Sequence, residues 1–219
     1  IKNTLDDIFP DELANAKEAA IWTFKHNIKD AQLEKLVSVA DSDLHNLFSY
    51  MDKHGFFHFY VTIKSFYTDW FSERDFARSH RQFQLIYLSL VPEGLSKSMS
   101  KTYADDLRDA LKGIFAGKPW WSTIATNGVG GCWRLTSIDS STDIAVRLKS
   151  EIIGGNFHKN PNYNSYIKMI LVCGLARNIA AHEGANFVKL DQGVHKTFLT
   201  YIVYTTFFCW KEAERKGLV

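Results

Sequence analysis

Apolar residues recur along most of this chain at the three- and four-residue spacing of a helix that buries one face. Leu44, Leu47, Phe48 and Met51, for example, would share one side of a helix. Only four prolines interrupt the 219 residues, so long helices can form. We therefore predict an all-α fold, with helices over residues 11–27, 31–40, 42–53, 56–71, 72–90, 100–115, 142–153, 162–182 and 194–215.

Turn signals and a change in composition divide this helical pattern. Pro92-Glu93-Gly94 should end the helix that begins near Ser72, and Gly154-Gly155 should end the helix over 142–153. Residues 117–141 are rich in Gly, Ser, Thr and Trp, which indicates an inserted loop or small hairpin. We expect residues 1–219 to form a single all-helical domain that carries this Gly/Trp-rich insertion.

Composition indicates an ordinary globular protein but does not identify its partner. Hydrophobic residues make up 46% and charged residues 23% of the chain, as in ordinary globular proteins. A net charge of +2 does not by itself indicate a nucleic-acid partner. Three widely spaced cysteines fit no disulfide framework or Cys-based zinc site, and we see no signal peptide or membrane span. We therefore expect a cytoplasmic protein, and the first residue, Ile1, leaves room for an upstream domain.

The residues that point to chemistry lie near the end of the predicted helix over 162–182. Arg177 and His182 are five residues apart, and Asn178 follows the arginine directly. Asn178 and His182 are helical i,i+4 neighbours, and the long side chain of Arg177 can reach the same end. An imidazole can exchange protons near neutral pH, and a guanidinium is a permanent phosphate ligand. This trio could therefore help an RNA 2′-OH attack its own phosphodiester without a metal ion.

The sequence Arg-Asn-Ile-Ala-Ala-His at residues 177–182 resembles the Arg-x4–6-His signature of the HEPN superfamily of ribonucleases. It looks closest to the effector domains of type III CRISPR ancillary ribonucleases, in which a CARF domain senses cyclic oligoadenylate. The resemblance covers about eleven residues and the helical context. It implies a HEPN-like helical bundle in a defence or toxin system, with Arg177, Asn178 and His182 at the catalytic centre.

The same resemblance implies partners as well as a reaction. Two copies of the motif would meet across a homodimer and form one composite site, with single-stranded RNA as the substrate. No cofactor or metal is implied. An upstream sensor domain or an antitoxin would be a further partner.

Other interpretations stay open at this stage. Arg177 and His182 could simply interact with the carbonyl groups at a helix C-terminus, which would make the chain a non-catalytic dimerisation or nucleotide- or RNA-binding module. Arg78 and Arg81 could follow an RNA backbone or face solvent. Lesser candidates are a His54–His58 metal pair, Gly128–Gly131 as a phosphate loop, Trp120, Trp121 and Trp133 as base-stacking or loop-pinning residues, and Cys173 as a nucleophile or core residue.

Overall fold

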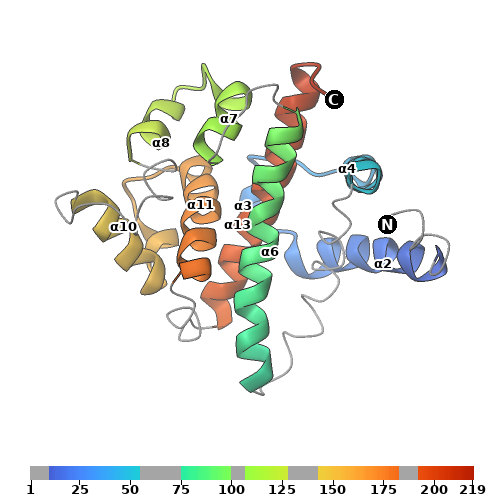
Figure 1. The fold of residues 1–219 in the computed structure, drawn as a ribbon, viewed down its shortest axis with the longest axis horizontal. Helices are drawn as coiled ribbons and strands as arrows, with labels where there is room; N and C mark the ends of the chain where they lie inside the picture. Colours follow the sequence, from blue (N-terminus) through green and yellow to red (C-terminus); the bar gives the residue numbers. More distant parts are fainter. Residues whose placement is uncertain (1–9, 55–74, 100–106, 128–142, 183–191) are drawn as a thin grey trace. The chain divides into compact units, whose positions relative to one another are not determined.

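The computed structural model describes residues 10–54, 75–99, 107–127, 143–182 and 192–219, and within these ranges every regular element is a helix (Figure 1). The predicted all-α class is confirmed for this part of the chain. The chain divides into two compact units, residues 1–77 and 78–219, and each is described by itself below. The predicted helix over 56–71 lies outside the described residues.

The N-terminal unit contains a pair of packed helices and two shorter turns. Its elements are α2 (Pro10–Thr23), a π-helical turn η1 (Phe24–Ile28), α3 (Ala31–Glu34) and α4 (Asp41–His54). Asp30 starts α3 by accepting hydrogen bonds at its side-chain oxygen from the amides of Gln32 and Leu33. The prediction of one helix over 31–40 is wrong beyond Glu34, because Asp43 accepts a hydrogen bond from the Ala40 amide and starts α4 there.

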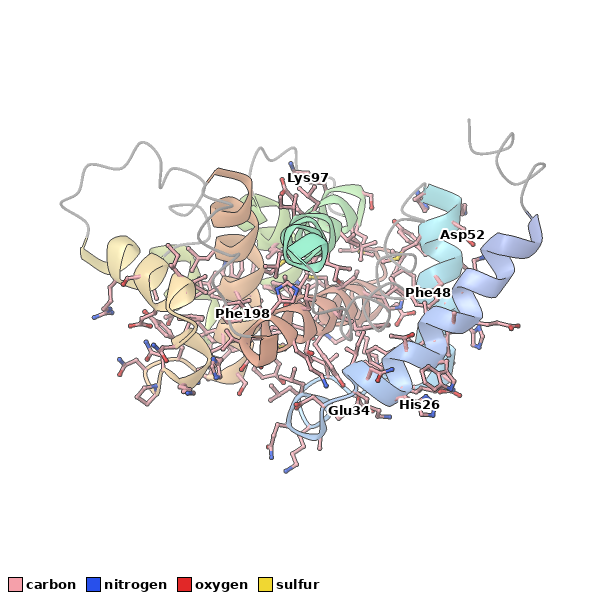
Figure 2. All side chains as sticks on the ribbon, turned by 90° about the horizontal axis from the view of Figure 1, so that it is seen from below. His26, Glu34, Phe48, Asp52, Lys97 and Phe198 are labelled. Atoms are coloured by element: carbon pink, nitrogen blue, oxygen red, sulfur yellow. The ribbon has the colours of Figure 1, made fainter. Side chains whose placement is uncertain are left out.

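Helices α2 and α4 pack against each other. Lys17 near the middle of α2 forms an ion pair with Asp52 near the end of α4. The Nζ atom of Lys25 in η1 lies 2.6 Å from Oδ2 of Asp41 at the start of α4. Figure 2 shows Asp52 and Phe48 on α4. The four residues predicted to face inward from α4, namely Leu44, Leu47, Phe48 and Met51, are all buried.

The C-terminal unit is built around one pair of long helices. Helix α11 (Ser165–His182) packs against α13 (Gln192–Arg215), and this is the most extensive contact between the described elements (Figure 1). Helices α8 (Trp121–Asn127) and α10 (Asp143–Ile153) pack against α11, whereas α7 (Leu107–Phe115) packs against α13. A 3-10 turn, η2 (Phe157–Lys159), follows α10, and α6 (Asp75–Met99) precedes α7.

Helix α13 is buried on all sides over much of its length. Residues 202–210 are buried without a break, as expected for a central helix. The hydroxyl groups of Thr205 and Thr206 donate to the carbonyl oxygens of Tyr201 and Ile202, one turn earlier. These polar side chains are therefore satisfied within the helix itself. Two aromatic residues of this helix, Tyr204 and Phe207, are fully buried in the core.

Helix α6 does not end where its sequence predicts. Pro92 lies inside α6, and the helix continues to Met99, so the prediction that Pro92-Glu93-Gly94 ends it is wrong. A proline in a helix interior removes one hydrogen bond and costs about 3 kcal/mol. Leu95, Ser96 and Met99, which follow the proline, are all buried. Burial of this last part of the helix offsets the cost of the proline.

The segment over 117–141 was predicted as a loop or small hairpin, but its residues 121–127 form helix α8, and residues 128–141 lie outside the described residues. Trp120 introduces this helix. Its ring stacks on Tyr166 of α11 at 5.6 Å between centroids and contacts Phe115 and Phe208. Trp120 therefore pins the segment to the bundle, because burial of aromatic surface outweighs the loop-like composition.

A charged cluster near the end of α13 yields the first testable prediction. Lys118 donates to Glu212 at 2.8 Å, and Arg215 donates to the same carboxylate at 3.0 Å. Burial raises the pKa of Glu212, but these two hydrogen bonds outweigh it and hold the pKa below the ordinary value of 4.5. Glu212→Gln should therefore lower the free energy of unfolding at neutral pH by about 1 kcal/mol.

The pH dependence of the stability lost in Glu212→Gln tests whether these two hydrogen bonds lower the pKa of Glu212. A carboxylate with a lowered pKa contributes its full stability at neutral pH and loses it as the pH falls through the folded-state pKa. In urea unfolding, the difference between the wild type and Glu212→Gln should therefore shrink as the pH falls below about 4. Glu214→Gln, at an exposed position on the same helix, is the matched control. A difference that stays constant from neutral to acidic pH would contradict this account.

Candidate functional site

The residues predicted to carry chemistry lie on the last two turns of α11. The helix includes Arg177, Asn178 and His182, and its first turn is capped by Asn164, whose side-chain oxygen accepts from the Ile167 amide at 2.9 Å. Residues 169–175, directly before the motif, are buried without a break. The backbone that carries the motif is therefore continuous with a helix fixed in the core.

The helical backbone brings the three motif residues to one end of α11. At 1.5 Å per residue, Arg177 and His182 are separated by about 7.5 Å along the helix axis. Asn178 and His182 lie one turn apart on the same side. The C-terminal end of a helix carries partial negative charge and favours cationic side chains such as arginine and protonated histidine. The placement of the three side chains themselves lies outside the described part of the structure.

The first turns of α13 begin at Gln192, ten residues after the end of α11 at His182 (Figure 1). Their position is set partly by Gly155, which follows α10 with a φ of +69°. A Cβ atom on Gly155 would lie 3.1 Å from a methyl carbon of Val194. The absence of a side chain at Gly155 therefore allows close packing of the α10–η2 turn against the start of α13.

One buried residue at the start of α13 was missed by the sequence analysis. His195, on the first turn of α13, is only 1% exposed. Its spacing to Phe198, Leu199 and Ile202, which are also buried, places it on a stripe of inward-facing positions. That i, i+3, i+4, i+7 pattern could have identified it, but a histidine beside Lys196 in a first turn is more often exposed.

A polar cluster at the other end of α11 is separate from the motif. Lys168 donates to the carbonyl oxygen of His158 at 2.9 Å, and burial lowers the pKa of Lys168. Burial, together with the nearby charges of Lys159 and Lys168, lowers the pKa of His158. These groups connect η2 to the first turns of α11. Lys168 lies about 13 Å from Arg177 along the helix axis.

The weaker candidates receive little support from the described residues. Arg78 and Arg81 share one side of α6 by their spacing, but their side chains lie outside the described part, so RNA contact by them stays a prediction. His54 is exposed and stacks on Tyr50 at 4.2 Å, whereas His58 lies outside the described residues, as do Gly128–Gly131 and Trp133.

The two described cysteines are core residues. Cys173 is fully buried on α11, with its sulfur 3.7 Å from the Ser89 carbonyl oxygen. Burial raises the pKa of Cys209 to about 12. Neither environment favours the thiolate that a nucleophilic cysteine needs. The described residues also contain no group of three or more His, Cys, Asp or Glu side chains that could hold a metal ion.

Comparisons with known proteins identify no relative. No family model, no curated protein and no solved structure matches this chain. Among the described helices, none is long and apolar enough to cross a membrane.

The close packing at Gly155 gives a prediction about stability. Gly155→Ala should lower the free energy of unfolding, because the new methyl group meets Val194 and the backbone φ is unfavourable for alanine. Gly217→Ala is the matched control, since Gly217 has a similar φ of +65° but no atom within 4 Å of the added Cβ. We expect a loss of about 1 kcal/mol for the control and about 1–3 kcal/mol more for Gly155→Ala.

Urea unfolding of both variants measures this difference. Addition of Val194→Ala to Gly155→Ala should recover part of the extra loss, because it removes the methyl groups that the new side chain meets. Equal losses for the two glycine variants would show that contact with Val194 has no energetic consequence.

Proposed function

We propose that this chain is a metal-independent endoribonuclease with Arg177, Asn178 and His182 as its active centre. The observation that carries the proposal is the placement of this motif on the last two turns of α11, a helix buried without a break over residues 169–175. Catalytic groups on a rigid element need less ordering when substrate binds. The motif combines a proton-transfer group, the imidazole of His182, with a permanent cation, the guanidinium of Arg177.

Each motif residue has a role in the proposed reaction. His182 takes the proton from the 2′-OH as general base, or supplies one to the leaving group as general acid. Arg177 binds the scissile phosphate and neutralises the charge that grows on its oxygens in the transition state. Asn178 orients His182 or the substrate through its carboxamide.

The bonds and protons of this reaction balance without a further reactant. The 2′-oxygen forms a bond to phosphorus, and the bond from phosphorus to the 5′-oxygen breaks. The proton lost by the 2′-OH is matched by the proton gained by the 5′-oxygen. The products are a 2′,3′-cyclic phosphate and a 5′-OH. The reaction requires RNA, since DNA lacks the attacking hydroxyl.

The resemblance to HEPN ribonucleases supports further parts of the proposal. It favours a HEPN-like bundle, a homodimer with one composite site, and a cytoplasmic role in a defence or toxin system. The all-helical described part is compatible with such a bundle. An upstream sensor or an antitoxin would then control the activity.

Cleavage of a fluorescent single-stranded RNA in EDTA tests the active centre. We expect Arg177→Ala and His182→Ala each to reduce the cleavage rate by about 100-fold or more. Arg147→Ala and His45→Ala, which change an exposed arginine and an exposed histidine elsewhere, are the matched controls and should cleave normally. Circular dichroism and thermal unfolding would show that all four variants are folded. Wild-type rates in folded His182→Ala would overturn the assignment.

The composite site predicts that cleavage depends on dimerisation. Sedimentation should show a particle of twice the mass of the chain, and the activity per chain should fall on dilution below the dimer dissociation constant. A monomer that cleaves RNA with constant activity per chain over a wide range of concentrations would contradict the composite site but not the roles of the motif residues.

A further inference from the structure

The segment that carries the motif also holds the positive charge of the chain. Residues 143–182, from α10 through η2 to the end of α11, contain five Lys and Arg and two Asp and Glu. The whole chain has 26 basic and 24 acidic side chains, so the remaining residues have 21 and 22. Helix α10 packs against both η2 and α11 (Figure 1). The excess positive charge therefore lies on one packed part of the C-terminal unit.

Two lysines of this part have no carboxylate partner among the described side chains. The carboxylate of Glu151 is already engaged, because it accepts a hydrogen bond from Nδ2 of Asn160 at 2.6 Å and lies 3.9 Å from Nε of Arg147. Lys168 instead donates to the carbonyl oxygen of His158 at 2.9 Å, and Lys159 is exposed. Within the described part, the positive charges of Lys159 and Lys168 are therefore not balanced.

The charges of the two lysines act together on one imidazole. Burial lowers the pKa of His158, and repulsion by Lys159 and Lys168 lowers this pKa further. Burial also lowers the pKa of Lys168. A half-buried ammonium group beside a second cation is costly unless an anion compensates its charge. Titratable groups that are perturbed and also held in fixed positions are typical of functional sites.

We propose that Lys159 and Lys168 bind phosphate groups of a single-stranded RNA, outside the active centre proposed on α11. This inference rests on the proposed function for the identity of its ligand. An ammonium group has three N–H donors, and the bond to the His158 carbonyl oxygen fixes the Lys168 group while it leaves donors for phosphate oxygens. Contacts of this kind position a strand without reading its sequence.

Helix α11 connects this phosphate contact to the motif. Lys168 and His182 are fourteen positions apart on one continuous helix, which separates them by about 21 Å along the axis and about 40° around it. The two positions therefore lie on nearly the same side of α11. A strand that passes the motif can follow this side of the helix to the lysines, whereas a single phosphate cannot span that length. The spacing favours a strand over a small phosphate ligand.

The salt dependence of RNA binding tests this contact. The ligand is a fluorescent RNA strand with 2′-O-methyl groups, which cannot undergo the proposed cleavage, and its dissociation constant is measured in EDTA at several NaCl concentrations. Each lost phosphate contact should reduce the slope of log affinity against log salt by about 0.7, or about fivefold in affinity at about 0.1 M salt. We expect this change in Lys159→Gln and in Lys168→Gln, whereas Lys168→Arg should keep the wild-type slope.

Two lysines elsewhere in the same unit provide matched controls. Lys112 on α7 is exposed, as Lys159 is. Lys216 is half-buried and donates to a backbone carbonyl oxygen at 2.8 Å, as Lys168 does. Lys112→Gln and Lys216→Gln should keep the wild-type slope. Thermal unfolding shows whether each variant is folded, and Lys159→Gln, which changes an exposed side chain, keeps the test decisive if Lys168→Gln is unstable.

A second measurement follows the imidazole between the two lysine charges. The titration of His158, assigned by its absence in His158→Gln, can be recorded by NMR of histidine-labelled protein. Bound strand should raise the midpoint by about 0.5 pH units or more, because the phosphate charge offsets the repulsion by Lys159 and Lys168. The other described charged groups of this cluster, Arg147 and Glu151, are unchanged. Inorganic phosphate at the same concentration of phosphate groups should leave the midpoint in place, and a rise with it alone would overturn the assignment to a strand.

The possible results distinguish this proposal from the one on which it rests. A wild-type slope in both folded Lys159→Gln and folded Lys168→Gln, or no binding of the strand by folded wild type, would overturn the RNA contact. Normal cleavage of RNA by these variants together with a wild-type slope would leave the ribonuclease proposal standing. Reduced slopes without any cleavage by folded wild type would support the RNA contact and overturn the ribonuclease proposal.

Discussion

The packing of α11 against α13 is the interaction on which the C-terminal unit depends. Residues 169–175 of α11 and 202–210 of α13 are each buried without a break. Such helices have no solvent-facing side and require neighbours all round, which explains why α8, α10 and α7 pack on this pair. Burial of each large aliphatic side chain contributes about 1.5–3 kcal/mol. The hairpin therefore accounts for much of the core.

The same packing gives the motif a defined place. A helix that is enclosed in its middle holds its ends at fixed positions, so the backbone of Arg177 and His182 is set by contacts made several residues earlier. The motif therefore lies on the backbone of a regular helix. Stability and the proposed chemistry are in this way properties of one helix.

The sequence predicted most accurately the helices that bury only one face. The inward face of α4, from Leu44 to Met51, follows directly from its spacing. The end of α6 at Pro92 and the loop at Trp121 were predicted wrongly, because tertiary burial overrides the local effect of proline and of loop-like composition. The position of the motif on a late helix was predicted, whereas the burial of His195 was missed although its spacing to Phe198, Leu199 and Ile202 indicates it.

The central claim is that RNA is cut by its own 2′-OH at the end of α11. Its most direct test is to offer the folded protein, in EDTA, an RNA strand and the all-deoxy strand of the same sequence, and to identify the ends of any products. The account predicts that only the RNA is cut and that its fragments carry 2′,3′-cyclic phosphate and 5′-OH ends. Cleavage of the deoxy strand, 5′-phosphate ends, or no cleavage by folded dimer would contradict it.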